Sequence, residues 1–181
     1  YCVQHSLVTS PIPTKISDKF WKFFYSLKSG THVTFYGGEP LVYYPAIKEI
    51  VSRRSDLEYG MPSNCKLLNE RMVDFFNKHN VKITVSWDGS ASRYTRGYDA
   101  FRENRDVIDK LDDYAIGSVI SRASPLGELF KDVREYFPDK ENSFQGIERI
   151  SWQGRQIDEK SKNVVAGELQ STVGCRWRFG Y

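Results

Sequence analysis

The chain has 181 residues, of which 40% are hydrophobic and 27% are charged, and its formal net charge is +3. This composition is ordinary for one globular domain with a buried core, and so small a charge gives no reason to expect nucleic acid or a membrane surface as a partner. No apolar stretch approaches the ~20 residues of a membrane span, and the start lacks the basic flank and apolar run of a signal peptide. We therefore expect a cytoplasmic protein.

Periodic apolar residues predict helices and strands in alternation along the chain. The first expected helix begins after Ser17 and ends before Gly30. Four further helices are expected over residues 44–54, 69–79, 99–112 and 125–137. The expected strands cover residues 31–36, 61–64, 81–87, 115–121 and 147–152. Strands separated by helices of this length pair in parallel through βαβ crossovers, so the predicted fold class is α/β. From residue 153 the pattern loosens, and we divide the chain into a core of residues 1–152 and a segment of residues 153–181, which is either a C-terminal tail or the start of a further element.

The first expected strand ends in a turn that suits a small polar ligand. Gly37 and Gly38 let the backbone turn sharply and leave its N–H and C=O groups uncovered. Glu39 precedes Pro40, which pushes it toward an extended conformation. In parallel βα folds, ligands bind at the carboxyl ends of the strands, where the loops converge. The alternative is a plain glycine turn between a strand and a helix.

Two further strand ends carry polar side chains. Asn64 lies at the end of the next extended segment. It could contact a ligand, or it could be an ordinary turn former or helix cap. Ser86 lies at the end of the strand after that, and Arg96 comes a few residues later. A hydroxyl and a guanidinium suit a small polar ligand, because arginine forms bidentate bonds to carboxylates. The alternative makes Asp88-Gly89 a turn and Arg96 a surface charge.

The three cysteines, Cys2, Cys65 and Cys175, are widely scattered. The absence of a C-x-x-C pair excludes a zinc ribbon and a thioredoxin-type motif, and so few cysteines do not form a disulfide framework in a chain of this length. For Cys65 and Cys175 the ordinary interpretation is a buried or incidental thiol.

The Gly-Gly-Glu-Pro turn at a strand end resembles the site for the methionine amino group in radical S-adenosylmethionine (SAM) enzymes. Tyr1-Cys2 resembles the last two residues of that family's C-x3-C-x2-aromatic-C motif. Ser63-Asn64 is loosely similar to the family's Thr-Asn-Gly strand end, but Cys65 stands where the glycine usually is. This departure weakens the expectation of a positive-φ turn there.

The third strand end is similar to one branch of the same family. Ser86-Trp87-Asp88-Gly89, followed by Arg96, resembles the Ser-x-Asp-Gly strand end of the sulfatase maturases and peptide-modifying enzymes. The resemblance covers residues 1–152. It implies a partial (β/α)6 TIM-like barrel with a parallel sheet and outer helices, in a chain that lacks the first strand and is truncated within its cysteine motif.

The resemblance also implies two cofactors, a 4Fe-4S cluster and S-adenosylmethionine (AdoMet). Cys2 would be a ligand of the cluster, since soft thiolates suit iron–sulfur clusters. The residues that would contact AdoMet are Tyr1, Gly37, Gly38, Glu39, Pro40, Asn64, Ser86 and Arg96. The implied activity is reductive cleavage of AdoMet to a 5′-deoxyadenosyl radical, which abstracts hydrogen from a peptide, protein or small-molecule substrate. An electron donor such as flavodoxin or ferredoxin would be a partner.

Two other functions stay open at this point. One is a non-catalytic βα domain that binds a nucleotide or a protein partner, and a chain with one motif cysteine should behave in that way. The other is an ordinary βα-barrel enzyme that uses Glu39, Asp88 and Arg96 for acid–base chemistry. Cys175 alone cannot show whether auxiliary clusters follow.

Overall fold

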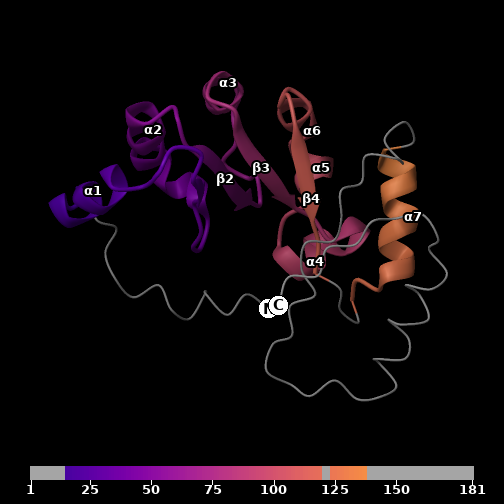
Figure 1. The fold of residues 1–181 in the computed structure, drawn as a ribbon. Coiled ribbons are helices and arrows are strands. Elements are labelled where there is room, and N and C mark those ends of the chain that lie inside the picture. The colour runs from indigo at the N-terminus through magenta and orange to yellow at the C-terminus, as the bar shows by residue number, and fades with distance from the viewer. Residues whose placement is uncertain (1–14, 120–122, 138–181) are drawn as a thin grey trace, which may run out of the picture. The chain divides into compact units, whose positions relative to one another are not determined.

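The structure, a computed structural model, describes residues 15–119 and 123–137 (Figure 1). Tyr1, Cys2, the strand predicted over residues 147–152, Cys175 and the tail of residues 153–181 lie outside the described residues. Within the described ranges, no helix is both long enough and apolar enough to cross a membrane.

Four strands form one sheet in the order of the sequence. They are β1 (His32–Thr34), β2 (Glu58–Ser63), β3 (Val81–Ser86) and β4 (Tyr114–Gly117), and their order in the sheet is β1-β2-β3-β4. β1 pairs with β2 in parallel, and Val33 lies opposite Tyr59. A parallel pair requires a crossover connection, which helix α2 (Tyr44–Arg53) supplies here. The predicted α/β class with a parallel sheet is therefore confirmed.

Capping residues determine where two of the helices begin. Ser17 accepts a hydrogen bond from the backbone N–H of Phe20 at 3.2 Å, at the start of α1 (Asp18–Tyr25). Asn69 accepts one from the N–H of Met72 at 3.2 Å, at the start of α3 (Glu70–Lys78). The other described helices are η2 (Pro40–Tyr43), η3 (Gly89–Ala91), α4 (Ser92–Arg96), α5 (Ala100–Glu103), α6 (Arg105–Ile108) and α7 (Leu126–Tyr136).

The described chain divides into two compact units. The first unit holds residues 15–84 and 104–114, and the second holds residues 85–103, 115–119 and 123–137. Each has its own apolar interior. Buried side chains of the first unit include Phe24, Leu41, Ile47, Val51, Tyr59, Met61, Val73, Phe76, Ile83 and Ile108, and those of the second include Val85, Trp87, Phe101, Leu129, Val133 and Phe137.

The single helix predicted over residues 99–112 is wrong, because the segment breaks at Asn104. This residue has φ −142° and ψ 24°, and it separates α5 from α6. Its side-chain Nδ2 donates to the backbone carbonyls of Cys65 at 2.9 Å and Leu68 at 3.0 Å. Asparagine side chains that bond to backbone groups compete with helix formation, and here the partners come from a distant loop of the same unit.

The bounds of the first two strands also differ from the prediction. β1 is shorter than expected, although the N–H of Phe35 still donates to the carbonyl of Gly60 at 2.9 Å. β2 begins three residues earlier than expected, at Glu58, because β1 offers it a partner. Pairing thus overrides the low strand propensity of Gly60 and Pro62, which made this segment hard to recognise from sequence.

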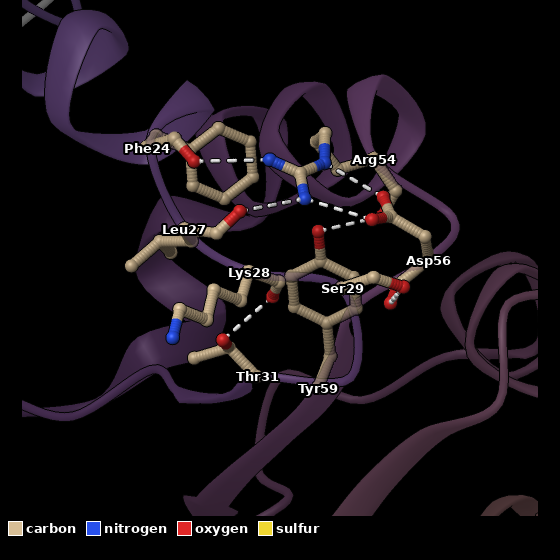
Figure 2. A network of polar contacts seen from close by, with 8 residues as sticks. All are labelled: Phe24, Leu27, Lys28, Ser29, Thr31, Arg54, Asp56 and Tyr59. Carbon is tan, nitrogen blue, oxygen red and sulfur yellow. Dashed lines mark hydrogen bonds and ion pairs between the residues drawn. The ribbon is translucent and has the colours of Figure 1, made fainter.

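Arg54 ties three segments of the first unit together (Figure 2). Its Nη1 and Nη2 donate to the carbonyls of Phe24 at 3.2 Å and Leu27 at 3.1 Å, at the end of α1. Its Nε and Nη2 bind the Asp56 carboxylate at 2.6 and 2.8 Å. The Tyr59 hydroxyl donates to the Arg54 carbonyl at 2.8 Å. The guanidinium therefore donates to carbonyls at the end of the helix, and it fixes α1 beside the start of β2.

This network predicts a pH dependence of stability. Hydrogen bonds from Arg54 lower the pKa of Asp56 from 3.8 to about 2. Because the native pKa is the lower one, the contribution to stability is complete above about pH 4 and is lost as the pH falls toward about 2. We expect the free energy of unfolding to fall less steeply over this range in Asp56→Asn than in the wild type, measured by urea unfolding at each pH. Asp74→Asn, which removes another exposed carboxylate of the same unit, controls for net charge. Equal slopes for the wild type and Asp56→Asn would contradict the prediction.

Candidate functional site

The turn after β1 presents open backbone, as the sequence predicted. Gly37 has φ +150°, in a region that favours glycine, and both Gly37 and Gly38 are exposed. A Cβ placed on either glycine would meet no atom within 4 Å. The peptide groups of this turn are therefore accessible to a ligand.

The Glu39 carboxylate reaches across to the end of β2. Its Oε1 accepts hydrogen bonds from the Ser63 hydroxyl at 2.8 Å and from the backbone N–H of Leu41 at 3.1 Å. Its Oε2 accepts one from the backbone N–H of Asn64 at 2.9 Å. The Asn64 side chain in turn accepts from the N–H of Lys66 at 2.9 Å, which closes a turn after the strand. Sequence reasoning placed Glu39 and Asn64 in the site but did not predict that they bond to each other.

Cys65 adopts a positive-φ conformation, which was not expected because a cysteine stands here in place of the motif's glycine. Its φ is +56°, so the expectation of a weakened turn is wrong. The Ser63 hydroxyl accepts from its N–H at 2.9 Å, and Asn104 donates to its carbonyl at 2.9 Å, which together hold the strained backbone. The side chain is 0% exposed, and burial raises the pKa of the thiol to about 12. Cys65 is thus a buried thiol, as expected, and its position does not fit a cluster ligand.

The turn after β3 is organised by Asp88, a buried carboxylate of the second unit. Its Oδ1 accepts from Arg96 Nη2 at 2.7 Å and from the backbone N–H of Val119 at 2.8 Å, and its Oδ2 accepts from the Thr95 hydroxyl at 2.8 Å. The Arg96 side chain is only 18% exposed and that of Asp88 is 0% exposed. The interpretation of Arg96 as a surface charge is therefore wrong. Ser86, at the end of β3, is partly exposed.

Trp87 anchors the same strand end. Its Nε1 donates to the Asp99 carboxylate at 3.0 Å, and its ring packs edge-on against Phe101 with 5.2 Å between the ring centroids. The Ser118 hydroxyl donates to its carbonyl. These contacts, together with those of Asp88, give the turn a fixed shape that the Ser-x-Asp-Gly pattern alone did not reveal.

The predicted site residues thus fall into two clusters. Gly37, Gly38, Glu39, Pro40 and Asn64 belong to the first unit, whereas Ser86 and Arg96 belong to the second. Their convergence on one mouth of a barrel stays a prediction. Tyr1 and the predicted cluster ligand Cys2 lie outside the described residues. In the part of the chain that the structure describes, no group of His, Cys, Asp and Glu side chains could hold a metal ion.

Comparisons with known proteins show which proteins resemble this chain. No family model matches the sequence. The uncharacterized protein MJ0907 of Methanocaldococcus jannaschii is 24% identical over 95 residues, and the radical SAM cyclopropyl synthase TigE of Paramaledivibacter caminithermalis is 26% identical over 102 residues. These matches cover 49% and 50% of this chain, and 33% and 22% of the two relatives.

Solved structures share the fold. A structure of anSMEcpe with bound AdoMet is similar at a TM-score of 0.62 and 14% identity, and one with AdoMet and a peptide at 0.63 and 15% identity. The chain carries the core fold of radical SAM enzymes. Each of these alignments covers 98% of this chain and 58% of the solved one. In this fold, the Gly37–Gly38 turn and the Asp88–Arg96 pair both follow strands at their carboxyl ends, where parallel βα folds bind ligands.

Proposed function

We propose that this chain is part of an enzyme that binds AdoMet and reductively cleaves it to a 5′-deoxyadenosyl radical. The observation that carries the proposal is the open Gly37–Gly38 backbone at the end of β1 of a radical SAM fold. A 4Fe-4S cluster would supply the electron for cleavage, and Cys2 is the residue of this chain that we assign to it. Cys65 does not fit that role because its thiol is buried.

The chain's own residues would bind and orient AdoMet. Backbone carbonyls of Gly37 and Gly38 can accept from its amino group, and we assign its carboxylate to Arg96, the part-buried cation of the second unit. Asn64 and Ser86 offer neutral donors and acceptors suited to the ribose hydroxyls. Asp88 keeps the guanidinium in one place, so that Arg96 is already positioned when the ligand arrives.

We assign the substrate to the peptide class, with a small molecule as the alternative. The support is that a structure with the same fold holds both AdoMet and a peptide. A one-electron donor such as flavodoxin or ferredoxin would deliver the electron. Acid–base chemistry by Glu39 and Asp88 is disfavoured, because both carboxylates are engaged by protein donors.

The proposal is tested with the full-length protein, reconstituted with iron and sulfide under anaerobic conditions. We expect 5′-deoxyadenosine to form from AdoMet when dithionite is added, measured by chromatography and mass spectrometry. Cys2→Ala should remove this product by removing a cluster thiolate. A protein that binds AdoMet and holds the cluster but yields no 5′-deoxyadenosine would instead favour the non-catalytic binding domain.

A further inference from the structure

The ladder between β1 and β2 stops before either strand reaches the candidate site. The N–H of Phe35 donates to the carbonyl of Gly60 at 2.9 Å. Pro62, two residues further along β2, has no N–H with which to donate the next bond. Backbone pairing therefore does not fix the Gly37–Gly38 turn relative to the loop after β2.

The Glu39 carboxylate bridges the two strand ends beyond that point. It accepts from the Ser63 hydroxyl at 2.8 Å and from the N–H of Asn64 at 2.9 Å on the β2 side, and from the N–H of Leu41 at 3.1 Å on its own side. Hydrogen bonds to an ionised acceptor are about twice as strong as neutral ones. A single side chain thus links the glycine turn, the start of η2 and the end of β2.

Ser63 passes this restraint on to the next turn. Its side chain is buried, and its hydroxyl both donates to Glu39 and accepts from the N–H of Cys65 at 2.9 Å. Asn104 holds the same loop from its other side through the carbonyls of Cys65 and Leu68. The positive-φ backbone at Cys65 is therefore held between two polar side chains, and one of these depends on Glu39.

We propose that Glu39 is a positioning residue, which acts on AdoMet through the loop after β2 and does not touch the ligand with its carboxylate. The inference rests on the proposed function, since AdoMet is the ligand that the turn would hold. Its basis is that the three hydrogen bonds of this carboxylate within the described residues all come from protein donors of the same unit. Within the first unit, the ligand contacts then fall to the Gly37–Gly38 backbone and to Asn64.

A double-mutant cycle tests this inference in the full-length, cluster-loaded protein. Glu39→Gln keeps the size of the side chain but turns an acceptor into an NH2 group that faces N–H or O–H donors. Ser63→Ala removes the hydroxyl that links Glu39 to the N–H of Cys65, and it leaves the Gly37–Gly38 turn unchanged. We expect each change to weaken AdoMet binding roughly tenfold, and the double variant to bind about as weakly as Glu39→Gln alone. Losses that multiply to about a hundredfold would show that Glu39 acts independently of Ser63 and would overturn the proposal.

A control and a second measurement separate this inference from the proposed function. Thr31→Val removes a hydroxyl that bonds to the Lys28 carbonyl near the other end of β1, and it should leave AdoMet affinity unchanged. Hydrogen exchange without AdoMet should be faster at the amides of Asn64 and Cys65 in Glu39→Gln, and unchanged exchange would refute the positioning role. If the wild-type protein does not bind AdoMet, the proposed function fails, and the exchange data still decide whether Glu39 positions the loop.

Discussion

Replacing Asp88 with alanine should lower the free energy of unfolding by about 3–5 kcal/mol, the usual cost of removing one partner of a buried ion pair. The Asp88 side chain is 0% exposed and that of Arg96 is 18% exposed, so the guanidinium would stay in a poorly hydrated site. The backbone N–H of Val119 and the Thr95 hydroxyl would also lose an acceptor. Each such loss adds a desolvation cost. Urea unfolding of the wild type and the variant measures the difference.

Two further variants show whether the buried charge is the cause. Asp88→Asn keeps the shape and one oxygen acceptor, so it should cost less than Asp88→Ala. Adding Arg96→Met to Asp88→Ala removes the guanidinium charge that has lost this carboxylate, so the double variant should recover part of the lost stability. A loss below about 1 kcal/mol in Asp88→Ala would mean that water reaches Arg96 freely, and it would contradict the buried pair.

Features set by neighbouring residues could be predicted from sequence. Helices α2, α3 and α7 begin and end within one residue of the predicted bounds, because apolar spacing and caps such as Asn69 act locally. The sheet class followed from the alternation of the elements. The helix expected over residues 99–112 failed, because Asn104 bonds to a loop almost forty residues away. Periodicity contains no information about such a partner.

The same division holds within the candidate site. The glycine turn was recognisable, because Gly37 and Gly38 determine their own backbone freedom. Two hydrogen bonds join different strand ends, from Ser63 to Glu39 and from Val119 to Asp88. No local sequence pattern predicts them. At Cys65 the local rule was wrong. It predicted a weak positive-φ turn, but a hydrogen bond from the distant Asn104 stabilises the turn. Residue types thus indicated the candidate site, and tertiary contacts determine which of its groups remain available to a ligand.

Gly38→Val should weaken AdoMet binding by up to about 100-fold while leaving the fold intact. A Cβ on Gly38 would meet no protein atom within 4 Å, and Gly38 is not among the glycines with positive φ, so the substitution should not strain the chain. The new methyl groups would instead occupy the space from which a ligand approaches the backbone. Inserting extra methyl groups into a close contact costs about 1–3 kcal/mol, and the upper end of that range corresponds to about 100-fold in affinity.

Gly89→Val is the matched contrast. Gly89 has φ +66°, and a Cβ there would collide with the carboxylate of Asp132, so this variant should lose stability. AdoMet affinity and the urea unfolding midpoint, measured for both variants in the full-length, cluster-loaded protein, separate the two effects. Gly38→Val should change affinity without changing the midpoint, whereas Gly89→Val should lower the midpoint. Wild-type affinity in Gly38→Val would show that the ligand does not approach this backbone, and the proposed AdoMet site would then lose the observation that carries it.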